Sequence, residues 1–303
     1  MSLNASFANA LKSAHEAAAA QHYPPSALYV VATPIGNLAD ITLRALHVLH
    51  LADSIACEDT RHTQPLLRAY GIEKGSTQLL AVHQHNEAQA CDEVLRRLKA
   101  GQRVAYVSDA GTPGVSDPGA RLVAAVVAAG LKVVPLPGAS SITAALSVAG
   151  IVHEGGFVFV GFPPAKTMER DAVVAAWALE PRTVVLLEAP HRIDALAMSL
   201  STLGARPVTV ARELSKQFEE VVTLPAQTLG DWLRVRPQRQ RGEFVLVLHP
   251  QNVEVDAGED LRVLRLLLTE LPVKTAVKLA AQLTGTSRNS LYELALELKD
   301  AVD

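Results

Sequence analysis

A strand that breaks into a loop rich in proline and glycine most constrains how this chain can fold. The run from Leu28 to Ala32 is apolar and favours a strand, Thr33-Pro34 ends it, and Gly36-Asn37 leads into a helix-like pattern from Ile41. In an α/β domain, this transition from strand to loop to helix is the usual place for a nucleotide-like ligand. Neither G-x-G-x-x-G nor G-x-x-x-x-G-K-[ST] occurs in the sequence, so neither a dinucleotide site nor a P-loop is indicated. The loop therefore suits a ligand without phosphate.

Composition limits the class of protein further. The chain has 303 residues, of which 49% are hydrophobic, and its formal net charge is −3. This length suggests about two domains, and the charge argues against a broadly cationic surface while allowing a local basic patch. Cys57 and Cys91 lie far apart and no C-x-x-C occurs, so we expect neither a disulfide scaffold nor a metal site. We find no apolar run of ~18–20 residues and no signal peptide, and we therefore expect a cytoplasmic protein.

Strand-like and helix-like patterns alternate in the first half of the chain and predict an α/β domain over residues 27–150. The expected strands are 28–33, 53–57, 78–82, 103–108 and 131–136, and the helical patterns between them include 87–100 and 119–129. This alternation predicts a largely parallel sheet with helices on its faces. Before it, residues 1–26 form an Ala-rich N-terminal tail, in which 8–20 either make a short helix or stay loose.

A second α/β domain is expected over residues 151–250, after a glycine-marked hinge. Its expected strands are 157–161, 183–188, 207–212, 219–224 and 243–248, with helices at 168–179 and 192–203. The last two strands follow each other without a long crossover helix, so part of this sheet is expected to be antiparallel. An acidic linker at 253–260 then leads to a helical, helix-turn-helix-like unit over 260–303. Its expected helices are 261–270, 273–283 and 287–299, with Ser287 as a cap.

Two further loops share the character of the first. Ser108 to Gly119 follows an apolar strand and combines glycine and proline corners with two aspartates and several hydroxyls, and Pro135 to Ser141 repeats this pattern after the next strand. The first of them can also be explained as an elaborate turn capped by Asp117. However, three such loops at the carboxyl ends of strands in one sheet would converge on one crevice.

Seven motifs in a fixed order give the chain a family resemblance. They are Thr33-Pro-Ile-Gly-Asn-Leu38, Glu58-Asp-Thr-Arg-His62, His83-Gln-His-Asn-Glu87, Ser108 to Gly119, Gly161-Phe-Pro-Pro164, Pro190-His-Arg192 and Ala211-Arg-Glu-Leu214. With these motifs the chain resembles the tetrapyrrole methylase superfamily, and within it the bacterial branch that methylates ribosomal RNA. The resemblance extends from about residue 28 to the C-terminus.

The resemblance implies a two-domain α/β fold with S-adenosylmethionine in the interdomain cleft, and a homodimer. It implies 2′-O-methylation of a cytidine ribose in small-subunit (16S) ribosomal RNA, either free or in the assembled subunit. The residues that it implies for cofactor binding are Pro34, Ser108, Asp109, Ala110, Thr112, Pro113, Val115, Ser140, Ser141, Leu187, Ala211 and Gly242. A sulfonium cofactor is positively charged and carries no phosphate, which agrees with loops rich in carbonyl groups that include an aspartate.

The loop after the second strand carries the candidate catalytic residues. Transfer to a ribose hydroxyl requires alignment and removal of one proton, and a general base contributes ~10²–10⁴-fold. We expect Asp59 or His62 to lie near that proton, with Glu58 as a third candidate. Asp59 can instead simply cap a helix that starts near Arg61.

Basic and polar side chains elsewhere are candidates for RNA contact. They are Arg61, His85, Asn86, Arg192, Arg234, Arg236, Arg239 and Arg241. Arginine can bind phosphates and stack on exposed bases. The alternatives are that the arginine run is a solvated loop, that Asn86 caps a helix, and that Arg192 pairs with Glu188. For the whole protein, the alternatives are a methyltransferase acting on a tetrapyrrole precursor and a non-enzymatic RNA-binding assembly factor.

Overall fold

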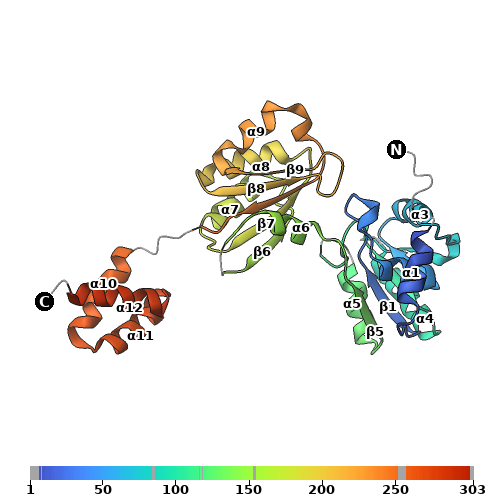
Figure 1. Ribbon diagram of the computed structural model, residues 1–303, viewed down its shortest axis with the longest axis horizontal. Helices are drawn as coiled ribbons and strands as arrows, with labels where there is room; N and C mark the ends of the chain where they lie inside the picture. Colours follow the sequence, from blue (N-terminus) through green and yellow to red (C-terminus); the bar gives the residue numbers. More distant parts are fainter. Residues whose placement is uncertain are drawn as a thin grey trace.

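The computed structural model describes residues 7, 9–83, 86–115, 117, 119–152, 155–251 and 257–300. Two five-stranded sheets form the body of the protein, and a set of three helices follows them in the chain (Figure 1). This architecture confirms the predicted fold class.

The first sheet contains β1 (Ala27–Val31), β2 (Ser54–Cys57), β3 (Leu79–Ala81), β4 (Val104–Val107) and β5 (Lys132–Leu136). All its strands are parallel, in the order β3-β2-β4-β1-β5. The apolar runs predicted all five strands to within two residues at each end. Because β4 lies between β1 and β2, the loops that follow these three strands are neighbours at one edge of the sheet.

Helices cover both faces of this sheet, as expected for parallel strands. They are α2 (Leu43–Leu51), α3 (Thr60–Ala69), α4 (Glu87–Lys99) and α5 (Gly119–Ala128), with short 3₁₀ turns at Leu38–Asp40 and Ser76–Gln78. Side chains alternate between the two faces along each strand. In β4, for example, Ala105 and Val107 belong to the core cluster that includes α2, whereas Val104 and Tyr106 belong to the cluster that includes α4 and α5.

The N-terminal segment forms helix α1 (Ala10–Ala18), the first of the two predicted alternatives. Its Ala14 and Ala18 are buried, and the rings of Phe7 and Tyr70 meet edge to face with centroids 5.4 Å apart. The helix packs on α2 and extends the core of the first domain.

The second sheet has the order β6-β7-β10-β8-β9. Its strands are β6 (Phe157–Gly161), β7 (Thr183–Glu188), β8 (Pro207–Arg212), β9 (Glu220–Pro225) and β10 (Phe244–Leu248). Only β6 and β7 pair in parallel, so the expected antiparallel part is confirmed. One face is covered by α7 (Thr167–Ala178), α8 (Ile193–Leu200) and α9 (Leu229–Val235), and the connections include 3₁₀ turns at Ser201–Leu203, Ala226–Thr228 and Pro237–Gln240.

Helix α6 (Ser141–Val148) covers the other face of the second sheet, although the predicted range of the first domain runs to residue 150 (Figure 1). Its Ile142 and Ala145 pack against Val185 and Val247. The chain therefore passes to the second sheet directly after the loop that follows β5, which brings that loop close to the end of β7.

The C-terminal unit consists of α10 (Ala257–Glu270), α11 (Val273–Thr284) and α12 (Arg288–Asp300). Leu264, Val277 and Leu291 belong to its core, one from each helix. Gly285 ends α11 in the left-handed conformation, and Ser287 Oγ accepts a hydrogen bond from the N–H of Ser290, as a cap of α12 should. The expected linker at 253–260 overlaps the start of α10, and residues 252–256 lie outside the described part. No described helix is long and apolar enough to cross a membrane.

Candidate active site

A pocket of about 120 Å³ lies at the carboxyl ends of the strands of the first sheet. Residues from the loops after β2, β4 and β5 line it, together with the start of α6 and the end of β7. The lining residues are Glu58, Ser108, Ala110, Gly111, Thr112, Val115, Asp117, Ser140, Ser141, Ile142 and Leu187. The structure thus brings together many of the residues expected for cofactor binding, including Leu187 from the second sheet.

Backbone contacts hold the loops of this pocket together. The amide and carbonyl groups of Thr33 and Gly111 exchange two hydrogen bonds of 3.0 and 3.1 Å, and Gly111 has a φ of 81°, which favours glycine. Thr112 Oγ1 donates to the carbonyl of Ala139 at 2.9 Å. The loops after β1, β4 and β5 therefore form one connected wall, and their relative positions depend on these few bonds.

Asp117 is fixed in the wall by three donors. Its Oδ1 accepts hydrogen bonds from the Tyr106 hydroxyl at 2.8 Å and from the N–H of Gly119 at 2.9 Å, and its Oδ2 accepts one from the N–H of Gly114 at 2.6 Å. A Cβ at residue 119 would lie 2.1 Å from the Tyr106 ring. Asp117 organises the turn, as the structural alternative predicted, and it also lines the pocket. Sequence reasoning left it out of the candidate site because a capping aspartate has the same local pattern.

His62 and Asp109 form a hydrogen-bonded pair beside the pocket. His62 Nδ1 lies 3.0 Å from Asp109 Oδ2, and Asp109 Oδ1 accepts a hydrogen bond from the N–H of Asp59 at 3.2 Å. The hydrogen bond with the Asp109 carboxylate raises the pKa of His62 above its ordinary value. The pair joins the loops after β2 and β4, because these strands are neighbours in the sheet. The two residues are 47 positions apart in the chain, so local sequence patterns do not reveal the contact.

The Asp59 side chain is bound to Arg61. Its Oδ1 accepts from the N–H of Arg61 at 2.8 Å, which caps α3, and its carboxylate also binds the Arg61 guanidinium through Nε and a terminal nitrogen. These hydrogen bonds with Arg61 lower the pKa of Asp59 to about 2. The capping alternative is confirmed, and a carboxylate of such low pKa is a weak base.

Glu58 has the opposite environment. It is half-buried and lines the pocket, and burial, followed by the neighbouring Asp109 carboxylate, raises its pKa. Directly before it, burial raises the pKa of the Cys57 thiol to about 11, so this cysteine is not a thiolate nucleophile. The described residues hold no cluster of histidine, cysteine, aspartate or glutamate that could bind a metal ion.

Five of the expected cofactor-binding residues do not line the pocket. Asp109 holds His62, and Pro34 and Pro113 are buried in the loops around it. Ala211 is buried in the apolar cluster between α6 and the second sheet. Gly242 is covered by the side chain of Glu213, which would lie 2.4 Å from a Cβ there.

The candidates for RNA contact are scattered. Asn86 directly precedes α4, but its side chain accepts a hydrogen bond from the N–H of His83 and donates one to the carbonyl of Ala81, and it does not cap the helix. His85 lies outside the described residues. Arg192 Nε lies 3.1 Å from Glu188 Oε1, which confirms the pairing alternative, and a terminal nitrogen of Arg192 donates to the carbonyl of Pro163.

The arginine run divides into exposed and engaged side chains. Arg239 stacks on Trp232, with its guanidinium carbon 4.2 Å from the ring centroid, and pairs with Glu220 at 2.6 Å. Arg234 pairs with Asp231 but remains exposed. Arg236 and Arg241 are exposed as well. The exposed arginines can reach a ligand, whereas Arg239 stabilises the second domain.

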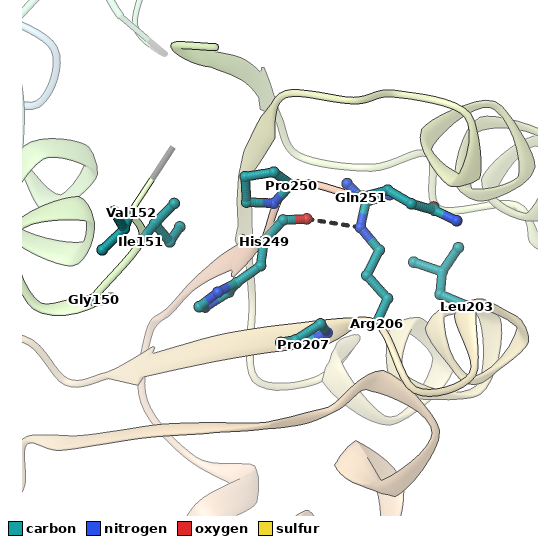
Figure 2. Close-up of a pocket in the computed structure, with 9 residues that line it drawn as sticks. All are labelled: Gly150, Ile151, Val152, Leu203, Arg206, Pro207, His249, Pro250 and Gln251. Atoms are coloured by element: carbon teal, nitrogen blue, oxygen red, sulfur yellow. Dashed lines mark hydrogen bonds between the residues drawn. The ribbon is translucent and has the colours of Figure 1, made fainter. Parts of the chain in front are cut away.

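A second cavity, of about 420 Å³, lies elsewhere, between the segment after α6, the start of β8 and the residues that follow β10 (Figure 2). Arg206 crosses it and donates from Nε to the carbonyl of His249 at 2.8 Å. His249 Nε2 in turn lies 2.7 Å from Thr209 Oγ1. These polar groups have partners within the protein, and none of the predicted site residues lines this cavity. The candidate site is therefore the smaller pocket.

The sequence profile of the tetrapyrrole (corrin/porphyrin) methylases matches residues 27–230, and that of the RsmI C-terminal HTH domain matches residues 254–299. The chain is 47% identical to ribosomal RNA small subunit methyltransferase I of Pseudomonas aeruginosa over 276 residues, which cover 89% of this chain and 96% of that protein. It is 46% identical to the protein of the same name from Escherichia coli O157:H7, over 89% of this chain and 94% of the other.

Solved structures share the fold. Uroporphyrin-III-C-methyltransferase of Thermus thermophilus superposes with a TM-score of 0.51 at 22% identity, over 74% of this chain and 94% of that one. Cobalt precorrin-4 methyltransferase superposes with a TM-score of 0.51 at 18% identity, over 73% of this chain and 94% of that one. The long match to the family profile and the high identity to full-length relatives agree with each other. The chain therefore belongs to the tetrapyrrole methylase family of methyltransferases and, within it, to the ribosomal RNA small subunit methyltransferase I group.

Proposed function

We propose that this protein transfers a methyl group from S-adenosylmethionine to the 2′-hydroxyl of a cytidine ribose in small-subunit ribosomal RNA. The observation that carries the proposal is the acidic pocket at the strand ends, in a chain that matches ribosomal RNA methyltransferases over almost their whole length. The resemblance further implies a homodimer, and action on ribosomal RNA agrees with the expectation of a cytoplasmic protein.

The pocket fits a cationic cofactor without phosphate. Its wall contains the carboxyl groups of Glu58 and Asp117, and the loops present backbone groups and small side chains to the interior. When bound, S-adenosylmethionine supplies a methyl group that is already activated by a positively charged sulfur. The volume of about 120 Å³ is below the ~300–1,000 Å³ of typical ligand sites. This pocket therefore accommodates only part of the cofactor.

The reaction needs one base and a fixed line of approach. The ribose oxygen bonds to the methyl carbon, the carbon–sulfur bond breaks, and the hydroxyl proton leaves to a base. In the pair described above, His62 donates from Nδ1 to Asp109, which leaves Nε2 as the basic nitrogen. We assign the base to His62 and place Glu58 on the cofactor side of the pocket. Asp59 is left with a capping role.

Exposed cations are available for the RNA. The Arg61 side chain is 88% exposed at the start of α3, one position before His62, so it can bind a phosphate next to the reacting ribose. Lys274, Lys278 and Arg288 are exposed on the C-terminal helices. We propose that the helical unit supplies further phosphate contacts at a distance from the pocket.

A transfer assay with three acceptors tests the proposed function. The purified protein is incubated with methyl-labelled S-adenosylmethionine and small ribosomal subunits, free small-subunit RNA, or a porphyrin precursor, with both RNA samples taken from cells that lack the modification. We expect label in RNA only. Label in the tetrapyrrole alone would transfer the assignment to that alternative, and RNA binding without any cofactor binding would favour an assembly factor.

A further inference from the structure

The loop after β8 reaches from the second sheet to the loop after β1. Its residues Glu213 to Lys216, here called the Lys216 arm, follow Arg212, the last residue of β8. Leu214 is buried in the cluster between α6 and the second sheet, and Ile35 of the first domain packs against that cluster. Next to Ile35, a Cβ at Gly36 would lie 2.3 Å from Lys216 Cγ and 2.9 Å from Lys216 Cε. The stem of Lys216 therefore lies directly on Gly36.

The space that a side chain at Gly36 would need is occupied by Lys216. Gly36 does not adopt a positive φ, so an L-residue is compatible with its backbone. What excludes a side chain is Lys216. Displacement of the lysine would disturb two ion pairs, because its Nζ is held by Glu213 Oε1 at 2.8 Å and by Glu243 Oε2 at 3.1 Å.

The arm itself is kept in an unusual conformation. Glu213 and Ser215 have φ values of 52° and 62°, which are costly for residues other than glycine. The Glu213 carboxylate accepts a hydrogen bond from the N–H of Glu243 at 2.9 Å, and it fills the space next to Gly242. Strain of this kind persists where surrounding contacts over-determine the structure, often at functional sites.

Contacts connect the arm to the pocket. Ile35 lies between the arm and Gly111, since a Cβ at Gly111 would be 3.2 Å from Ile35 Cγ2. Gly111 lines the pocket and exchanges hydrogen bonds with Thr33. Any movement of the loop after β1 therefore changes the pocket wall.

We propose that Lys216 is a positioning residue, which reaches from the second domain and holds the loop after β1 in the arrangement that binds the cofactor. Its partners are Gly36 as the surface on which it rests, and Glu213 and Glu243 as the anchors of its ammonium group. This role rests on the proposed function, because the ligand concerned is the proposed cofactor. The contact between Lys216 and Gly36 can nevertheless be tested without any ligand.

Hydrogen exchange of the unliganded full-length protein provides the first test. In Lys216→Met, Glu213 and Glu243 lose the ammonium group that they bind, so the arm holds the loop after β1 less firmly. We therefore expect the amides of Thr33 and Gly111 to exchange faster than in the wild type. Lys12→Met is the matched control, because Lys12 forms an exposed pair with Glu16 on α1. Unchanged exchange at both amides would overturn the proposal.

Binding of S-adenosylhomocysteine, measured by calorimetry, provides the second test. We expect Lys216→Met to weaken binding roughly tenfold or more, since small displacements at a positioned site are costly, and Lys216→Arg to recover part of the loss. Affinities equal to that of the wild type would contradict the positioning role. If the wild type itself does not bind the ligand, the proposed cofactor is wrong, and hydrogen exchange alone decides whether the arm holds the loop.

A double-mutant cycle separates the contact from general loss of stability. Gly36→Ala alone should accelerate exchange and weaken binding, because its Cβ displaces Lys216. With Lys216→Ala in the background, Gly36→Ala should have little further effect, since the three atoms nearest to that Cβ all belong to the removed part of Lys216. Equal effects of Gly36→Ala in both backgrounds would show that Lys216 is not the cause.

Discussion

The polar residues after β2 have different partners and therefore different chemistry. Glu58 faces the pocket with a raised pKa, Asp59 is bound to Arg61 with a pKa of about 2, and His62 is paired with Asp109. Their order in the sequence does not distinguish these roles. The partners that do so come from the loop after β4 and from the first turn of α3.

Replacement of Asp59 separates capping from catalysis. Asp59→Ala removes the cap of α3 and should lower the urea concentration at the midpoint of unfolding, whereas Asp59→Asn keeps a capping oxygen and should lower it much less. Urea denaturation measures both. The rate of methyl transfer should fall far less in either variant than in His62→Ala, for which we expect a loss of roughly 10²–10⁴-fold. A comparable loss of rate in Asp59→Asn would return the role of base to Asp59.

The pH dependence of turnover tests the assignment of His62. The base must be neutral, so activity should rise with pH through the pKa of His62, which the Asp109 carboxylate holds above its ordinary value. Asp109→Asn removes that charge and should shift the acid limb of the kcat profile to lower pH, with a lower plateau. Nuclear magnetic resonance titration should show the same shift for His62 and none for His249, which lies in the second domain. An unshifted acid limb would exclude the pair as the titrating unit.

At the scale of elements, the start of α5 depends on one glycine. A side chain at Gly119 meets the Tyr106 ring, and the Tyr106 hydroxyl also holds Asp117. Gly119→Ala should therefore destabilise the protein by about 1–3 kcal/mol through overpacking and weaken cofactor binding. Gly230→Ala is a control in which the same change meets no crowding. A Cβ at Gly230 in α9 would lie 3.8 Å from its nearest contact, the Arg234 side chain. Gly230→Ala should be neutral or stabilising by up to ~1 kcal/mol. Thermal denaturation of the two variants distinguishes these outcomes, and equal stabilities would contradict the packing argument.

The strands of both sheets could be predicted from the sequence because each is a short apolar run that ends at a turn residue. The position of β4 between β1 and β2 could not, since sheet order depends on tertiary packing and leaves no local pattern. The contact of His62 with Asp109 follows from that order and was missed for the same reason. The packing of α6 on the second sheet was also missed, because the apolar pattern of a helix does not show which sheet it packs against. The resemblance to a known family supplied the loops that line the pocket, but it did not indicate that Asp117 is part of the pocket wall or that Lys216 contacts Gly36.

At the scale of the whole molecule, the net charge is only −3, so binding of RNA depends on local groups of cations. Exposed Lys274 and Lys278 lie one turn apart on α11. If they contact phosphates, the combined change Lys274→Gln and Lys278→Gln should weaken RNA binding and reduce the slope of log affinity against log salt by roughly 0.7 per lost contact. Cofactor affinity should not change. An unaltered salt slope, measured by filter binding, would remove these residues from the RNA interface.

The most direct test of the account is to find which atom of the RNA receives the methyl group. Small ribosomal subunits that lack the modification are incubated with the protein and labelled S-adenosylmethionine, and the RNA is then hydrolysed in alkali and analysed by mass spectrometry. We predict label at one cytidine, in a dinucleotide that resists cleavage because its 2′-oxygen is methylated. Label on a base, or in RNA that is fully cleaved, would contradict the proposed reaction at the ribose.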